Sequence, residues 1–173
     1  MNRCIMIFPK FKNMEIINKI RDKYDPAAKF VEPHVTLVFP FESDIETDVL
    51  KEHVRTAIKG IKPFKMSLKG ITSKESFDNY IFVEVANGSH EIIKLYKNLY
   101  TGILEKHHPN WLHNTKFVAH MTVGKLATKE EVFTALKDLA HIDTSFKTTI
   151  DEIAVEIIDI DSSSIIEFTE KLL

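Results

Sequence analysis

The pattern His-apolar-Thr-apolar occurs twice in a strand-like setting, as HVTL at 34–37 and as HMTV at 120–123. Side chains along a β-strand alternate between its two faces. In each copy the imidazole and the hydroxyl therefore share one face, and the two apolar side chains share the other. Such a strand can bury its apolar face in a core and present its polar face to a cleft.

The elements around the two copies follow the same order. Hydrophobic periodicity predicts a strand, a helix, the His-x-Thr strand, a second helix and a strand that begins with Phe-Lys, at FKMSLKGI 64–71 and at FKTTIDEI 146–153. The motif histidines, His34 and His120, lie about half of the 173-residue chain apart. This similarity indicates a duplicated α+β unit, with the two motif strands in equivalent positions about a pseudo-twofold axis.

The hydrophobic pattern also predicts the residue ranges of the individual helices and strands. Helices are predicted over 13–24, 46–60 and 91–104, and after a capping box at 128–131. Strands are predicted over 3–8, 34–39, 64–71, 80–85, 118–123, 146–160 (as one strand or two) and 165–172.

The charge of the chain argues against a general polyanion binder. It has 23 Lys and Arg against 25 Asp and Glu, a net charge of -2, whereas such binders are usually strongly basic. Cys4 is the single cysteine, so no intramolecular disulfide can form, which fits a reducing compartment. No stretch approaches the roughly 20 apolar residues that span a bilayer. We therefore expect a cytoplasmic protein whose partners include neither a membrane nor DNA.

Two imidazoles and two hydroxyls in one cleft would suit phosphodiester cleavage without a metal or another cofactor. A neutral histidine can take a proton from the attacking group and a protonated one can give a proton to the leaving oxygen, because imidazole titrates near pH 6.5 (roughly). Thr36 and Thr122 can donate hydrogen bonds to the non-bridging phosphate oxygens. None of the four residues is a carboxylate, which would repel the anion. The structural alternative is that His34 and His120 are core histidines bonded to the backbone.

Other histidines are weaker candidates. A third copy of the pattern, at 113–115, lies in a polar stretch without the apolar alternation, and we interpret it as a chance occurrence. His107, His108 and His113 match no compact metal-binding spacing, so we expect no metal site.

Basic and aromatic residues are further candidates for substrate contacts. Lys125 would meet the phosphate only if the strand bends at Gly124, and is otherwise a solvated lysine. Phe39 and Phe77 could stack against a base, although most aromatic residues in such a chain belong to the core. The remaining candidates, each with an equally ordinary structural explanation, are Phe41, Tyr80, Trp111 and the lysines at 59, 62, 65 and 69.

The two motifs resemble those of a known family, the two-histidine (2H) phosphoesterases, which include the bacterial 2'-5' RNA ligase-like (LigT-like) proteins. The resemblance covers nearly the whole chain in length, element order and spacing. IMIFP near the start, YDP and PHVTL around the first motif, and LYTGIL before the second motif resemble the YjcG-like bacterial branch.

The resemblance implies a single bilobed α+β domain over residues 1–173. Two pseudo-symmetric lobes, each an antiparallel sheet with helices outside, would form a central cleft. His34 and His120 would be the catalytic acid/base pair, and Thr36 and Thr122 would bind the substrate phosphate. Substrates of the superfamily are 2',3'-cyclic phosphates, 2'-5'-linked RNA and cyclic phosphates of ADP-ribose. Acidic residues at 151, 152, 156, 159 and 161 disfavour a long RNA track and therefore large RNA substrates.

Our leading hypothesis is a metal-independent phosphoesterase that acts on a small nucleotide or an RNA terminus, and we expect it to be a monomer. Two alternatives stay open. One is a module that binds a nucleotide or RNA-end phosphate without turnover, and the other is an ATP-independent 2'-5' RNA ligase. The pattern does not assign the acid and the base between His34 and His120.

Overall fold

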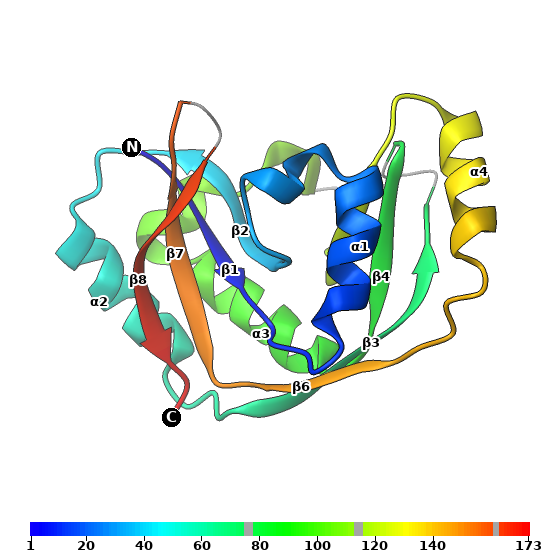
Figure 1. Ribbon diagram of the computed structural model, residues 1–173. Helices are drawn as coiled ribbons and strands as arrows, with labels where there is room; N and C mark the ends of the chain where they lie inside the picture. The colour runs from blue at the N-terminus through cyan, green and yellow to red at the C-terminus, as the bar shows by residue number, and fades with distance from the viewer. Residues whose placement is uncertain (75–77, 113–115, 161–162) are drawn as a thin grey trace.

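Two four-stranded antiparallel sheets dominate the computed structural model, which describes residues 1–74, 78–112, 116–160 and 163–173 (Figure 1). Sheet A has the strand order β2-β1-β7-β8 and sheet B the order β5-β4-β3-β6. The strands are β1 (Asn2–Ile7), β2 (Val35–Glu42), β3 (Phe64–Thr72), β4 (Tyr80–Asn87), β5 (His120–Lys125), β6 (Phe146–Ile150), β7 (Glu152–Ile158) and β8 (Ser164–Lys171). The α-helices are α1 (Met14–Tyr24), α2 (Thr47–Ile58), α3 (Ser89–Leu99) and α4 (Lys129–Leu139), and the 3-10 helices are η1 (Pro26–Lys29), η3 (Gly102–His107) and η4 (Asn110–Leu112).

The two repeat units exchange strands. β3 ends the first unit but pairs with β4 in sheet B, and β7 ends the second unit but pairs with β1 in sheet A. The two segments that begin with Phe-Lys pair with each other, with Phe64 opposite Ile150 and Leu68 opposite Phe146. This register places the pseudo-twofold axis at the middle of the β3–β6 pair. The predicted α+β fold of two pseudo-symmetric lobes is therefore confirmed, and the exchanged strands hold the lobes together.

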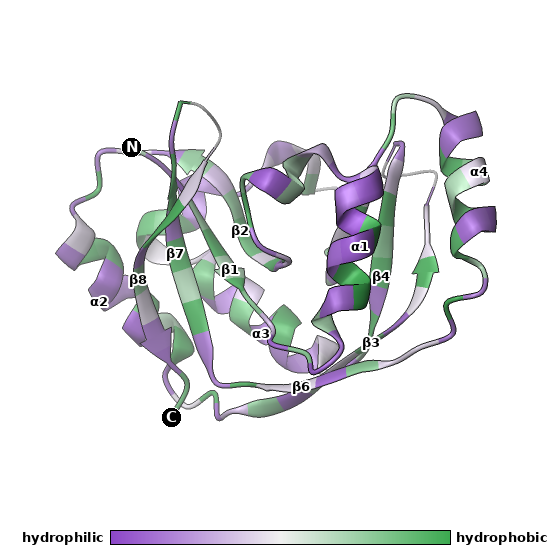
Figure 2. Cartoon of the chain, viewed as in Figure 1, coloured by the Kyte–Doolittle hydropathy of each residue, from purple (hydrophilic) through white to green (hydrophobic). Residues whose placement is uncertain are grey.

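The helices are exchanged in the same way. α1 of the first unit contacts β5, and α3 of the second unit contacts β2. The approach is close at Gly124 of β5, where an added Cβ would lie 3.1 Å from the Cβ of Tyr24 on α1. Figure 2 shows hydrophobic residues along the central strands β1, β7 and β4, and hydrophilic residues on the outward faces of α2 and α4. Each motif strand thus packs its apolar face on a helix from the other half of the chain.

One predicted element is wrong in extent. The helix predicted over 91–104 ends with α3 at Leu99, where Tyr100 leaves the helical conformation with a ψ of 41°, and η3 follows from Gly102. The segment over 146–160, predicted as one strand or two, is two strands, which separate at Asp151, where the chain passes from sheet B to sheet A. β2 runs past its predicted end through Pro40, which an edge strand tolerates because it needs no ladder N–H there.

The other predicted elements are present, with ends that differ by a few residues. The capping box of α4 is confirmed: the Thr128 hydroxyl accepts the Glu131 N–H at 3.2 Å, and the Glu131 carboxylate accepts the Thr128 N–H at 3.0 Å. Within the described ranges, no helix is both long and apolar enough to cross a bilayer.

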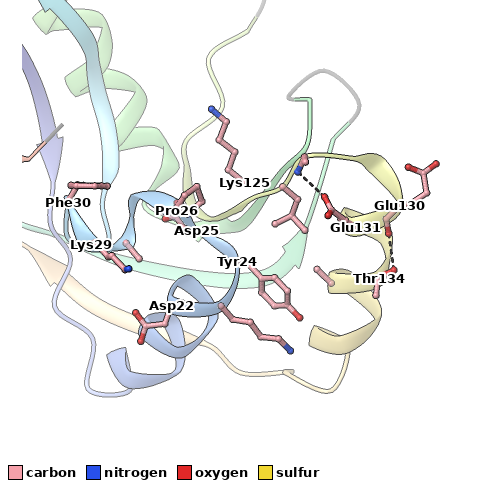
Figure 3. A pocket seen from close by; sticks show the side chains of 15 residues that line it. Asp22, Tyr24, Asp25, Pro26, Lys29, Phe30, Lys125, Glu130, Glu131 and Thr134 are labelled. Atoms are coloured by element: carbon pink, nitrogen blue, oxygen red, sulfur yellow. Dashed lines mark hydrogen bonds between the residues drawn. The ribbon is translucent and has the colours of Figure 1, made fainter. Parts of the chain in front are cut away.

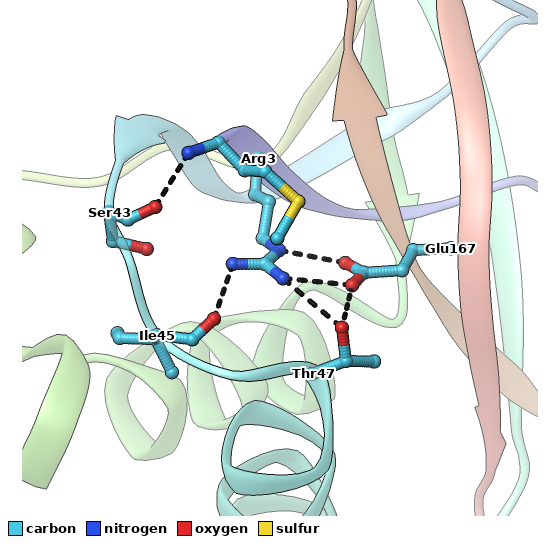
Figure 4. A network of polar contacts seen from close by, with 6 residues as sticks. Arg3, Ser43, Ile45, Thr47 and Glu167 are labelled. Atoms are coloured by element: carbon cyan, nitrogen blue, oxygen red, sulfur yellow. Dashed lines mark hydrogen bonds and ion pairs between the residues drawn. The ribbon is translucent and has the colours of Figure 1, made fainter.

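A buried ion pair joins β1 to β8 and to the start of α2 (Figure 4). The guanidinium of Arg3, a fully buried residue, donates two hydrogen bonds to the Glu167 carboxylate, at 2.8 and 2.9 Å. It also donates to the Ile45 carbonyl at 2.7 Å and to the Thr47 hydroxyl at 3.3 Å. Arg3 holds the pKa of Glu167 below its usual range, so the carboxylate stays ionised as its partner. This network stabilises the helix-covered side of sheet A.

Candidate active site

The motif strands are the edge strands of the two sheets, and they contact each other where the sheets meet. His34 immediately precedes β2, and His120 is the first residue of β5. The four polar motif residues, His34, Thr36, His120 and Thr122, are half-buried. The four apolar residues between and after them, Val35, Leu37, Met121 and Val123, are fully buried. The predicted alternation of polar and apolar faces is therefore confirmed in both strands.

Both histidines make the same hydrogen bond. Nδ1 of His34 donates to the Glu32 carbonyl at 2.8 Å, and Nδ1 of His120 donates to the Val118 carbonyl at 2.7 Å. Because a carbonyl oxygen can only accept, Nδ1 carries the hydrogen in each ring. Proton exchange with a substrate would then take place at Nε2. The carbonyl two residues before each histidine fixes both the tautomer and the orientation of the ring.

Burial lowers the pKa of both imidazoles. For His34, the backbone hydrogen bond and the carboxylate of Asp25 act in the opposite direction, whereas the charge of Arg21 lowers the pKa further. The charge of His120 also lowers the pKa of His34, in keeping with the contact between β2 and β5. For His120, the charge of Lys74 adds to the effect of burial.

A buried ion pair supports the segment that leads to His34. Arg21 Nε donates to Asp25 Oδ2 at 2.8 Å, and the two side chains are only 4% and 5% exposed. Arg21 also donates to the Val31 carbonyl at 2.9 Å, and Asp25 accepts the Ala27 N–H at 3.0 Å. This pair was not predicted from the sequence. A signal was nevertheless present, since position 21 falls on the apolar face of the predicted helix.

Beside His120, sheet B presents an aromatic ring and an ion pair. Phe82 on β4 lies next to the His120 imidazole, with ring centroids 5.0 Å apart, and it pairs with Thr122 in the ladder. Glu84 lies directly opposite His120, so both side chains leave the same face of the sheet. The Glu84 carboxylate pairs with Lys74 at 3.3 Å. The site thus has a carboxylate that the sequence analysis did not anticipate, since strand register is not visible in one sequence.

Lys125 reaches the same face as the motif residues through a β-bulge. Strict alternation from His120 would place it on the opposite face. The β4–β5 ladder shifts register between Ile81 and Phe82, which leaves Lys125 opposite Tyr80. Tyr80 is two places from Phe82 and shares its face. The Lys125 ammonium lies 5.2 Å from the centre of the Tyr80 ring.

The aromatic candidates fall into three groups. Phe39 on β2 makes an edge-to-face contact with the half-exposed Trp111, with ring centroids 5.0 Å apart. Phe41 is buried, and its ring packs against His107. Phe77 lies outside the residues that the structure describes. Phe39 of the motif strand β2 and Trp111 of η4 therefore form an aromatic surface together.

The basic and metal candidates lie on other surfaces. The lysines at 59, 62, 65 and 69 are exposed, and Lys69 pairs with Asp143 at 3.2 Å. Nε2 of His108 is 2.5 Å from the Tyr96 hydroxyl, and His113 lies outside the described residues. Across the described part of the chain, no three or more His, Cys, Asp or Glu side chains gather as metal ligands would.

A groove of about 920 Å³ lies between α1 with η1 and the start of α4 (Figure 3). Tyr24 lines it on one side and Thr134 on the other, and the Lys125 side chain extends away from them. Lys125, the last residue of the motif strand β5, lines the groove, so the groove borders the site. Neither motif histidine lines it.

Known proteins resemble this chain in both sequence and fold. Residues 9–160 match the model of the 2'-5' RNA ligase superfamily. A Bacillus licheniformis protein named "Putative phosphoesterase" is 32% identical over 148 residues, which are 85% of this chain and 84% of that protein. A Bacillus pumilus protein of the same name is 30% identical, with coverage of 85% and 83%.

Two solved structures share the fold. E. coli LigT in complex with 3'-AMP superposes with a TM-score of 0.65 and 13% identity, over 99% of this chain and 97% of that one. The Thermus thermophilus protein TT0787 gives a TM-score of 0.67 and 12% identity, over 99% and 98%. With a family match over most of its length, the chain belongs to the 2'-5' RNA ligase superfamily, the two-histidine phosphoesterases whose paired motifs it carries.

Proposed function

We propose that the chain is a metal-independent phosphoesterase of the cyclic phosphodiesterase type. Its substrate would be a 2',3'-cyclic or related phosphodiester on a small nucleotide or an RNA terminus. The observation that carries the proposal is the pair of equivalent imidazoles, His34 and His120, each with Nδ1 fixed by a backbone carbonyl. Two rings set to exchange protons at Nε2 are what a reaction with one general base and one general acid requires.

The reaction would move two protons. One neutral imidazole takes a proton from water at Nε2 while the water oxygen forms a bond to phosphorus. The bond from phosphorus to the ribose 2' or 3' oxygen breaks, and the protonated imidazole gives its Nε2 proton to that oxygen. The product is a phosphomonoester, and the proton of the pair has passed from one ring to the other.

The other residues on this face would bind the substrate. The hydroxyls of Thr36 and Thr122 would donate hydrogen bonds to the non-bridging oxygens, where negative charge is held in the transition state. Lys125 would add a positive charge near the same phosphate, because the bulge turns it onto the face of the motif residues. Phe39 and Trp111 would stack against the base, since an aromatic face accepts any of the four bases.

The ligands of a related fold support a nucleotide-sized substrate. LigT of E. coli has been crystallised with 3'-AMP, with NADP+ and with phosphate. A 3'-monophosphate is the product formed when a nucleoside 2',3'-cyclic phosphate loses its bond to the 2' oxygen. The name of the Bacillus relatives points to the same class of reaction.

Hydrolysis of nucleoside 2',3'-cyclic phosphates and of short RNAs that end in them, measured in EDTA, tests the proposal. Turnover should fall by roughly a hundredfold to ten-thousandfold in both His34→Ala and His120→Ala, the scale of lost acid/base catalysis. His90→Ala is the matched control, because His90 is an exposed histidine on α3, and it should keep wild-type activity. The position of the phosphate in the product identifies the leaving oxygen.

Three outcomes would contradict the proposal. Near-full activity in both motif variants would exclude paired histidine catalysis. A strict requirement for an added metal would exclude the mechanism. Phosphate or nucleotide binding that depends on both histidines but yields no product from any substrate would favour a binding module.

A further inference from the structure

We infer that Lys74 is a second cation of the phosphate site, held on Glu84 until a substrate phosphate displaces the carboxylate. The inference rests on the proposed function and adds a residue that the mechanism above does not use. The ligand is a phosphate group, either of the phosphodiester substrate or of the phosphomonoester product.

The strand register brings this ion pair to the site. Glu84 stands directly opposite His120 in the β4–β5 ladder, so its side chain leaves the same face of sheet B as the imidazole. Lys74 Nζ lies 3.3 Å from Glu84 Oε1. Lys74 follows the end of β3 by two residues, and Thr72 at that end pairs with Phe82, the residue whose ring contacts His120. The charge of Lys74 also lowers the pKa of His120.

The pair is suited to open. Its two side chains are 39% and 48% exposed, whereas those of the Arg21–Asp25 and Arg3–Glu167 pairs are at most 9% exposed. An exposed ion pair contributes little to stability, so Lys74 can leave Glu84 at low cost. A phosphate offers more acceptor oxygens and at least as much negative charge as a carboxylate, and an ammonium on a flexible stem can reorient to meet it.

The two partners then have opposite effects on phosphate binding. Lys74 attracts the phosphate directly. Glu84 opposes it twice, because it occupies the ammonium and because its own negative charge lies on the same face of sheet B as His120. If the pair only stabilised the connection between β3 and β4, removal of either partner would have the same effect, so the sign of the two effects separates the two explanations.

Binding of inorganic phosphate and of 3'-AMP, measured by calorimetry at pH 7, tests the inference. Lys74→Met should weaken binding by about tenfold to a hundredfold, the range for one hydrogen bond to a charged group. Glu84→Gln should tighten binding by about two- to tenfold. Lys74→Arg keeps the charge and should retain most of the affinity. The Lys69–Asp143 pair, 3.2 Å apart and exposed, provides the matched control, and Lys69→Met should leave both affinities within about twofold of the wild type.

The outcomes separate this inference from the proposed function. Equal losses in Lys74→Met and Glu84→Gln, or no change in either, would overturn the role of Lys74 while hydrolysis by the wild type could continue to support the phosphoesterase. A wild type that binds neither phosphate nor 3'-AMP would overturn the role of Lys74 as well. A wild type that hydrolyses no substrate, with phosphate affinities that move in opposite directions in Lys74→Met and Glu84→Gln, would refute the catalytic proposal alone. Thermal unfolding of each variant verifies that it is folded.

Discussion

Replacing Asp25 by Asn should reveal how strongly the Arg21–Asp25 pair stabilises the protein. The substitution leaves the charge of Arg21, whose side chain is 4% exposed, without its partner carboxylate. Breaking a buried ion pair from one side costs about 3–5 kcal/mol, and we expect the free energy of unfolding to fall by that amount. The Asn side chain retains an oxygen that can accept the Ala27 N–H, so the loss of this hydrogen bond does not contribute to the expected change in stability. Chemical denaturation measures the change.

The same pair should move the pKa of His34 in both directions. The Asp25 carboxylate raises this pKa and the Arg21 guanidinium lowers it. Asp25→Asn should therefore lower the pKa of His34 further below its ordinary value, and Arg21→Met should raise it. An NMR titration of the imidazole signals measures both shifts without any knowledge of the substrate.

Two further variants make the test decisive. The double variant Arg21→Met with Asp25→Asn should recover much of the lost stability, because removing both charges leaves neither one buried alone. Lys23 lies on the same helix as Arg21 and forms an exposed ion pair with Asp138 of α4. Lys23→Met should therefore leave the stability close to that of the wild type. A loss below about 1 kcal/mol in Asp25→Asn, or shifts of the His34 pKa in the same direction in both single variants, would refute the reasoning.

Four other results are expected. The rate should peak below about pH 6.5, because burial lowers the pKa of both motif histidines and the protonated acid is lost as the pH rises; a maximum above about pH 7.5 would contradict this. The stability contributed by the two neutral rings should be present above their unfolded pKa of about 6.5 and be lost as the pH falls toward the folded values, which acid titration of unfolding measures. Thr36→Val and Thr122→Val keep the side-chain shape and should each lower kcat/KM by about 10-fold to 100-fold. Wild-type activity in both variants would contradict the binding of phosphate by these hydroxyls. Trp111 is the single tryptophan, so its fluorescence should change when 3'-AMP binds but not when inorganic phosphate binds, and equal responses would argue against base stacking there.

The sequence carried the parts of the site that depend on local pattern. Alternation along two short strands was enough to predict that the imidazole and the hydroxyl of each motif share a face, because the period of a strand is fixed. The repeated order of elements was enough to predict two equivalent lobes. The capping box of α4 was visible because both of its residues lie within one turn.

The features that the sequence missed or left open depend on contacts between distant segments. Glu84 faces His120 only because β4 and β5 pair in one register, and a shift by one residue would turn every side chain of a strand to the other face. Lys125 reaches that face only because the ladder contains a bulge. The bulge lies next to Gly124, where α1 approaches β5 closely. Neither the register nor the bulge is a property of the local sequence.

The differences between the two halves matter as much as their symmetry. Two imidazoles in identical surroundings would titrate alike, yet the proposed reaction needs one neutral and one protonated ring at the same time. The fold gives both rings the same Nδ1 hydrogen bond, but different charges act on their pKa values. These charges are those of the buried pair Arg21 and Asp25 for His34, and that of Lys74 for His120. Because each protonated ring opposes the protonation of the other, the pair holds a single proton over a wider range of pH than two isolated rings would. One turnover moves this proton from one ring to the other, so the pair must return it through solvent before the next, and the charged residues around each ring set how readily it does so.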